Sequence, residues 1–484
     1  MSSWLVISTI IFYFGLLYLV SWITGRKADN QGFFVGNRKS PWYVVAFAMI
    51  GTSISGVTFI SVPGWVQASS FSYIQMVLGF IMGYVAIAYV LIPLYYRMNL
   101  VSIYEYLENR FGFSSYKTGA WFFFLSKMLG ASVRMFLVSS VLQLLIFDSM
   151  GIPFAINVMF TIGLIWLYTF RGGVKTLIWT DTLQTFALLA SVVLCIYYIA
   201  SDMGLSFSGV VNTVVDSDYS RVFFFDDMND KRNFFKQFLA GAFTTIAMTG
   251  LDQDMMQKNL SCKNIRDAQK NVLSCGISML PVNLLFLCLG VLLYTFAIHK
   301  GLTLPGKSDN LFPMIATGGH FPQIVGILFV LGLISAAYSS AGSALTALTT
   351  SFTVDVLGST RKKTDAEVTS IRKKVHVMMS IMMGLVIIVF EMMNNTSVID
   401  AVYILASYTY GPILGMFLFG ILTKWNVKDR YVPFVALLSP VLCYILSTNS
   451  EAWFNGYQFS YELLLFNAFF TFAGFFILRT KTGR

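Results

Sequence analysis

The chain has 484 residues, of which 56% are apolar and 12% are charged, and its mean hydropathy is +0.69. Soluble proteins carry charge on roughly 25% of their residues, so this composition excludes a water-soluble globule and indicates a protein of the lipid bilayer. The net charge of +10 is compatible with nucleic acid, but its distribution, described below, places it beside lipid headgroups and predicts no nucleic-acid binding. The five cysteines show no paired spacing, which excludes a disulfide framework and gives no sign of a zinc site.

Thirteen apolar stretches are long enough to cross the hydrocarbon as helices, which takes about 20 residues each. They predict an all-α polytopic membrane protein in which residues 1–484 form a single transmembrane transporter domain. The stretches are 3–24, 42–67, 71–96, 116–147, 151–170, 176–201, 233–253, 270–299, 322–357, 374–393, 396–421, 430–448 and 460–480.

Lysine and arginine are concentrated in alternate loops, which sets the direction of the chain. One such loop carries Lys258, Lys263, Arg266 and Lys270, whereas the longest loop on the other side, about 202–232, contains six aspartates. Because cytoplasmic loops are enriched in positive charge, we expect the N-terminus outside and the C-terminus in the cytoplasm. The expected location is the plasma membrane, which is the inner membrane in a Gram-negative cell.

Two spans contain polar and small residues that a lipid-facing helix does not need. Residues 51–58 read GTSISGVT in the second span, and residues 335–343 read SAAYSSAGS in the ninth. Non-helical backbone at membrane depth survives only beside protein or a water-filled cavity. Small residues also allow helices to pack closely. Hydroxyl and carbonyl oxygens are the ligands that a hard cation such as Na⁺ prefers, so close packing and an ion site are equal alternatives here.

Charged residues lie inside spans, where insertion of a charge costs at least about 2.5–3.5 kcal/mol, and Lys127 in the fourth span is one of them. Asp181 is early in the sixth span and Arg134 is in the middle of the fourth. A helix cap is the structural alternative for Asp181, and a salt bridge or carbonyl contact is the alternative for Arg134. The functional interpretation of Arg134 is a fixed cation for an anionic ligand, because a guanidinium binds a carboxylate through two hydrogen bonds.

The direction of the spans suggests two five-helix halves of opposite topology. The halves are 42–201 and 233–421, with a leading helix at 3–24 and two trailing helices within 430–480. The second half also opens with a polar segment, at residues 244–250. Paired interrupted helices at matching positions predict a binding site near the middle of the membrane.

Several short motifs in these spans resemble the sodium:solute symporter family, which has a LeuT-type fold with an extra leading helix. The resemblance covers nearly the whole chain, and its motifs are specific together and weak alone. They are Arg171-Gly172-Gly173, Trp179-Thr180-Asp181-Thr182-Leu183-Gln184, Asp252-Gln253, Gln257-Lys258, Ala336-Ala337-Tyr338-Ser339-Ser340 and Tyr410-Gly411-Pro412.

The resemblance implies Na⁺ as the coupling ion and two candidate sites for it. The first site would use backbone oxygens of Gly51, Ile54 and Ala336 with the hydroxyls of Ser339 and Ser340. The second site, a feature of bacterial sialic acid transporters in the family, would use Asp181, Ser339 and Ser343. A further serine of that pattern is Gly342 in this chain, which leaves one or two coupled sodium ions as alternatives.

The same transporters imply a solute site made by Ser55, Thr58, Gln75 and Arg134. The resulting prediction is a sodium-coupled symporter, and not an enzyme, that imports a small organic solute by alternating access. A carboxylate-bearing solute is favoured, with sialic acid as the leading candidate. The alternatives are a neutral sugar or another solute, a proton-coupled carrier, and a channel or sensor with the same fold. The sequence leaves the oligomeric state open.

Overall fold

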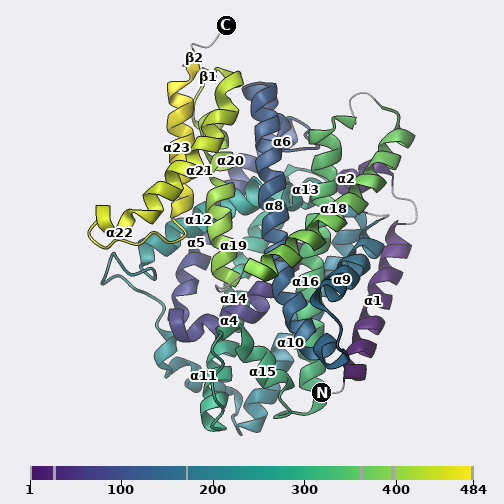
Figure 1. The fold of residues 1–484 in the computed structure, drawn as a ribbon, viewed down its shortest axis with the longest axis vertical. Helices are drawn as coiled ribbons and strands as arrows, with labels where there is room; N and C mark the ends of the chain where they lie inside the picture. Colours follow the sequence, from purple (N-terminus) through teal and green to yellow (C-terminus); the bar gives the residue numbers. More distant parts are fainter. Residues whose placement is uncertain (1–2, 26–28, 171–172, 360–362, 394–397, 481–484) are drawn as a thin grey trace.

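The structure is a computed structural model that describes residues 3–25, 29–170, 173–359, 363–393 and 398–480. The described chain is almost entirely helical (Figure 1). Arg171 and Gly172 of the sequence motifs lie outside the described residues, as do several of the loop and terminal basic residues: Arg26, Lys27, Arg361, Lys362, Lys481 and Arg484.

The helices follow one another with short connections. Up to residue 202 they are α1 (Ser3–Gly25), α2 (Asn30–Val35), η1 (Gly36–Arg38), α3 (Trp42–Ser53), α4 (Gly56–Ser69), η2 (Ser70–Ser72), α5 (Tyr73–Ala86), η3 (Ile87–Leu91), α6 (Ile92–Arg97), α7 (Glu105–Arg110), α8 (Phe113–Leu142), η4 (Gln143–Phe147), η5 (Asp148–Met150), α9 (Phe154–Thr169) and α10 (Gly173–Asp202). From there to residue 356 they are α11 (Phe207–Val215), η6 (Asp218–Ser220), α12 (Phe234–Thr245), η7 (Ile246–Gly250), α13 (Gln253–Leu260), α14 (Ile265–His299), η8 (Ser308–Asn310), α15 (Leu311–Thr317), α16 (Gln323–Ser351) and η9 (Phe352–Val356). The last are α18 (Asp365–Met393), α19 (Val398–Thr409), α20 (Gly411–Leu422), η10 (Asp429–Tyr431), α21 (Val432–Thr448), α22 (Ser450–Trp453) and α23 (Leu463–Ile477).

Two strands close the C-terminal part of the chain. β1 (Asn426–Val427) and β2 (Arg479–Thr480) pair antiparallel, with Asn426 opposite Thr480. This short ribbon joins the loop before α21 to the end of α23.

Among the described residues, each of the thirteen predicted stretches contains at least one helix, but several are interrupted. Within the described residues, eight helices are long and apolar enough to cross a membrane, or nine if the bent pair α19 and α20 counts as one span. Three further apolar helices, α3, α9 and α23, have 10–17 residues. An all-α protein with many apolar spans is therefore confirmed, whereas the count of thirteen stays a prediction.

Three of these interruptions lie within predicted spans. α19 and α20 meet at a bend of 45°, where Gly411 and Pro412 open the second helix. Proline lacks an N–H group and ends a preceding helix. The chain is also broken between α3 and α4, and a π-helical turn, Ile246–Gly250, separates α12 from α13.

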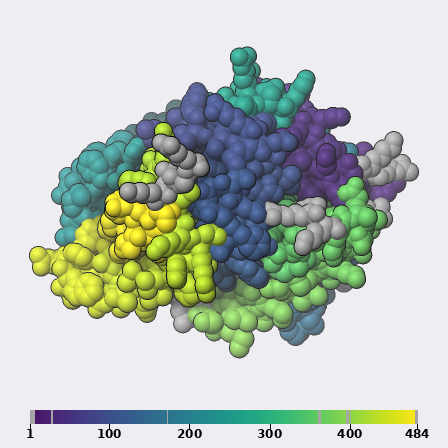
Figure 2. All heavy atoms as spheres, turned by 90° about the horizontal axis from the view of Figure 1, so that it is seen from above, coloured from purple at the N-terminus to yellow at the C-terminus, as the bar shows by residue number. Residues whose placement is uncertain are grey.

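Helix α16 lies at the centre of the molecule. Every residue from Gly332 to Ser351 is buried, and the helix contacts α10, α8, α3 and α4. A helix that is buried on all sides belongs in a core. The C-terminal helices form one side of the molecule, opposite the N-terminal part of the chain (Figure 2). The strands β1 and β2 lie at one end of the long axis, and α11 and α15 lie near the other (Figure 1).

Candidate functional site

The break between α3 and α4 interrupts the regular helical backbone at Ile54 and Ser55. Ile54 has φ −85° and ψ 89°, and Ser55 has φ −78° and ψ 173°, so neither residue is helical. Groups at helix ends lack intrahelical partners and are free for ligands. Gly51 lies one turn before the break, and its backbone is so close to Thr185 of α10 that a Cβ would collide with the Thr185 hydroxyl. Glycine is therefore required for the broken helix to reach α10.

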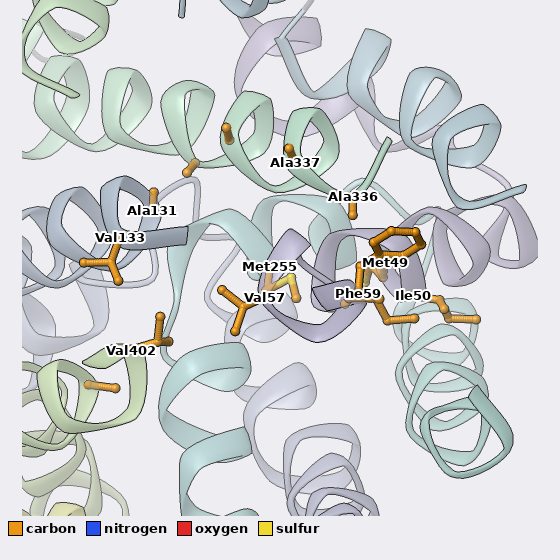
Figure 3. Packing of buried hydrophobic residues seen from close by; sticks show 14 of the residues in the cluster. Met49, Ile50, Val57, Phe59, Ala131, Val133, Met255, Ala336, Ala337 and Val402 are labelled. Atoms are coloured by element: carbon orange, nitrogen blue, oxygen red, sulfur yellow. The ribbon is translucent and has the colours of Figure 1, made fainter. Parts of the chain in front are cut away.

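Helix α16 runs beside this break. Figure 3 shows Ala336 and Ala337 of α16 on the side where Met49 and Ile50 of α3 lie. The Ser339 Oγ atom is 3.3 Å from the Thr52 Oγ1 atom, and Ser340 lines the same cavity as Ile54. The predicted ligand residues of the first sodium site are thus on two elements in contact, and their oxygens form a donor set that fits Na⁺.

Asp181 is the centre of a second polar cluster in the described chain. Its side chain is fully buried on α10, and its Oδ2 atom accepts hydrogen bonds from Thr52 and Ser343, each at 3.1 Å. Ser339 joins the cluster through Thr52. The residues predicted for the second sodium site are therefore neighbours, and Asp181 does not sit at the interface as a simple cap.

Lys258 also belongs to this cluster. Its Nζ atom is 2.5 Å from Asp181 Oδ2 and donates to the Thr52 hydroxyl, and its side chain is 1% exposed. The sequence pattern placed Lys258 among the basic residues of a cytoplasmic loop, which was wrong, because α13 carries it into the core. The motif Gln257-Lys258 was the only signal in the sequence, and it gave no role to the lysine.

Tyr168 explains the departure at Gly342. The Tyr168 hydroxyl donates to the Tyr338 carbonyl oxygen at 2.6 Å, and it lies where a Cβ on Gly342 would be. A serine at this position has no room unless Tyr168 moves. The ligand missing from the second-site pattern is therefore replaced by an aromatic side chain that fills the space.

A cavity beside the break contains three of the predicted solute residues. Ser55, Thr58 and Arg134 line it together with Tyr73 and Tyr403. Arg134 is half-buried and, within the described part of the chain, has no hydrogen bond or ion pair. The salt-bridge alternative for Arg134 therefore finds no support in the structure, and its guanidinium is available to a ligand.

A buried charged network forms another part of the cavity wall. Lys127 of α8 is 3.1 Å from Asp252 and 2.7 Å from Asp254, at the start of α13. Tyr410 donates to Asp252 at 2.5 Å. The sequence placed Lys127 inside a span but did not reveal its two carboxylate partners, since they lie about 125 residues away along the chain.

Gln75 has a different position from the other predicted solute residues. Its side chain is completely buried, its amide donates to the Arg232 carbonyl oxygen at 2.8 Å, and its Oε1 atom accepts from the Phe224 N–H group. These contacts hold the 202–232 loop against α5. The prediction that Gln75 lines the solute pocket is not supported by this position.

The sequence of this chain is similar to a family of sodium-coupled transporters along most of its length. The model of the sodium:solute symporter family matches residues 33–428. The sodium/sialic acid symporter NanT of Aliivibrio fischeri is 24% identical, with 92% of this chain and 88% of that protein covered. The sodium/sialic acid symporter SiaT of Proteus mirabilis is 23% identical, with 92% and 90% covered. The human sodium/iodide cotransporter is 23% identical, with 84% and 64% covered.

Two solved structures share the fold. A Na⁺-coupled sialic acid symporter in a substrate-bound outward-open state superposes with a TM-score of 0.83 at 19% identity, over 99% of both chains. Mhp1, a nucleobase-cation-symport-1 family transporter in a closed conformation, superposes with a TM-score of 0.53 at 13% identity, over 91% of this chain and 92% of the other. At these identities the likeness establishes the architecture alone.

These findings confirm three of the predictions made from the sequence. The protein is a carrier and not an enzyme, its coupling ion is Na⁺, and it resides in a membrane. The family model covers most of the length of the protein, from before α3 to the loop after α20. The chain therefore belongs to the sodium:solute symporter family.

Proposed function

We propose that the protein imports a small carboxylate-bearing solute together with Na⁺, and that sialic acid is the leading candidate. The observation that carries this proposal is Arg134, whose guanidinium shares a cavity with the hydroxyls of Ser55 and Thr58. A bidentate contact with a carboxylate satisfies such a group better than water in a confined site does. Two relatives that span most of the chain are sodium/sialic acid symporters.

The charges of the cavity wall favour joint binding of a cation and an anion. Lys127 and Arg134 are formally positive, and Asp252 and Asp254 are formally negative, so the four charges cancel. A carboxylate alone leaves an excess negative charge in a site of low dielectric, and Na⁺ alone leaves an excess positive charge. Binding both ligands keeps the site neutral, which is a physical reason for coupled binding.

The first sodium site, as we propose it, connects the two halves of the transporter. Gly51 and Ile54 belong to the broken helix of the first half, whereas Ala336, Ser339 and Ser340 belong to α16 of the second. Na⁺ between them holds one relative position of the halves. When the cavity opens inward, the ion leaves to a cytoplasm low in sodium, and the solute follows.

We also propose the thirteen-span topology with a five-plus-five inverted repeat. The break between α3 and α4 and the π-helical turn between α12 and α13 occupy matching positions in the two halves, which supports the repeat. An odd number of crossings would place the two termini on opposite sides of the membrane. The basic loops favour the C-terminal side as the cytoplasmic one.

The first experiment is thermal stabilisation of the purified protein by sialic acid, by a simpler monocarboxylate and by a neutral amino sugar, each in Na⁺ and in choline. A ligand that binds only the folded state raises the melting temperature by mass action. We expect sialic acid to raise it only in Na⁺. A sodium-dependent shift with the neutral sugar alone would instead reject the carboxylate class and leave the symporter standing.

A further inference from the structure

We propose that the Lys258 ammonium is the resident cation of the Asp181 cluster, where it takes the place of a second Na⁺, so that one Na⁺ binds per protein. The inference rests on the proposed sodium site at α3 and α16. It concerns a group that the sequence assigned to a solvated loop.

The ammonium uses the oxygens that a second ion would need. Asp181 Oδ2 receives Lys258 at 2.5 Å together with the hydroxyls of Thr52 and Ser343, and Thr52 is in contact with Ser339. The lysine also donates to Thr52. A lysine ammonium and Na⁺ carry the same charge and prefer the same oxygen partners. Two such cations on one buried carboxylate repel each other strongly, because the interior screens charge poorly.

The burial of the ion pair and the departure from the second-site pattern at Gly342 agree with this exchange. The lysine is 1% exposed and the aspartate is 0% exposed, so the pair neutralises itself without solvent. Gly342 replaces a ligand serine, and the Tyr168 hydroxyl fills the space beside it. The cluster therefore lacks one oxygen ligand of the second-site pattern and contains a cation that is covalently attached.

The elements that meet at this pair give the tethered cation a structural role. Asp181 is on α10 and Thr52 is on α3, both in the first half, whereas Lys258 is on α13 and Ser343 is on α16, both in the second. A bound Na⁺ can leave to the cytoplasm, but the ammonium stays with α13. It can hold the halves together without adding an ion to the transport stoichiometry.

The test is direct binding of ²²Na⁺ to the purified full-length protein, which needs no solute. We expect one Na⁺ per protein in the unsubstituted chain. We expect the charge-preserving control Lys258→Arg to bind one as well. In Lys258→Gln the freed carboxylate needs a cation, so a second, weaker Na⁺ should bind, and the additional change Asp181→Asn should remove it.

Several results would overturn the inference. Two Na⁺ in the unsubstituted chain would mean that the ammonium does not exclude the ion. A single Na⁺ in folded Lys258→Gln at every concentration would mean that the ammonium does not occupy the position of a second ion. Folding of each variant is checked by its size-exclusion profile and by the melting-temperature rise that Na⁺ produces at the first site. If no Na⁺ binds to any form, the proposed first site fails, which is a distinct outcome from a wrong stoichiometry.

Discussion

Arg134 determines whether the cavity distinguishes a carboxylate from a neutral sugar. A hydrogen bond to a charged group contributes about 1.5–3 kcal/mol, and each 1.4 kcal/mol corresponds to about tenfold in affinity. We therefore expect Arg134→Ala to weaken uptake of the carboxylate by about 10- to 100-fold, while Na⁺ still raises the melting temperature. Arg134→Lys keeps the charge but loses the planar fork, so it should be intermediate.

Uptake of labelled solute into proteoliposomes measures this effect. Unchanged carboxylate uptake in Arg134→Ala would remove the anion hypothesis. Neutral-solute uptake, if any is present, should respond little to the substitution, which makes it an internal control.

Gly342 is a second residue whose environment leads to a prediction. An alanine Cβ there collides with the Tyr168 hydroxyl, and such overpacking costs about 1–3 kcal/mol. Gly342→Ala should therefore lower the melting temperature by several degrees, and Tyr168→Phe in the same chain should restore part of it. Gly163→Ala is the matched control, because a Cβ at Gly163 meets nothing within 4 Å and alanine favours helix. Equal melting temperatures for both alanine variants would contradict the explanation.

At the scale of elements, the contact between α16 and the broken helix predicts the behaviour of Ser340. Removing one hydroxyl ligand from a cation site leaves the ion short of an oxygen partner in a place that excludes water. We expect Ser340→Ala to require about fivefold to tenfold more Na⁺ for half-maximal uptake, in line with the loss of one polar interaction of about 1–1.5 kcal/mol.

The control for Ser340 lies on the same helix. Ser335 donates to the Tyr13 hydroxyl of α1 and faces away from the cavity. Ser335→Ala therefore removes a hydroxyl from α16 without removing a predicted ligand, and the sodium dependence of uptake should stay unchanged. A shift of equal size in both variants would attribute the effect to packing of α16.

The elements show which parts of the molecule were predictable from the sequence. Apolar stretches located the helices because about 20 such residues are needed to cross the membrane, and the glycine and polar residues of 51–58 located the first break. Lys258 could not be placed, because a lysine followed by other basic residues is typical of a loop. Its partner Asp181 is 77 positions away in the chain, and only the packing of α13 against α10 brings the two together.

The sequence also located some of the candidate site residues but not all of them. Ser55, Thr58 and Arg134, which the resemblance implied for the solute site, line one cavity, and their contact with a solute stays a prediction. Gln75 has the right type of side chain, but its amide is used by the backbone of the 202–232 loop. Hydrogen bonding to a distant loop leaves no periodicity in the sequence, so a polar residue near the break could not be assigned to the solute or to the loop.

For the molecule as a whole, the resident ammonium sets the number of coupled Na⁺ ions and therefore whether the membrane potential drives solute accumulation. Moving one charge across 100 mV is worth about 2.3 kcal/mol, and a tenfold concentration ratio is worth about 1.4 kcal/mol. One Na⁺ with one monocarboxylate moves no net charge, so the potential contributes nothing. A second Na⁺ would make the cycle electrogenic.

Accumulation in proteoliposomes distinguishes these cycles. With a tenfold inward Na⁺ gradient and a monocarboxylate, we expect about tenfold accumulation, and a potassium diffusion potential of about 100 mV, negative inside, should not change it. One more coupled charge would instead multiply accumulation by roughly fifty at that potential, since about 2.3 kcal/mol at 1.4 kcal/mol per tenfold is a factor of that size. A neutral co-substrate would show the same voltage sensitivity with one Na⁺, so the solute of known charge must be used. Voltage-dependent accumulation of the monocarboxylate would therefore count against the ammonium as the replacement for the second ion, even with the carboxylate site intact.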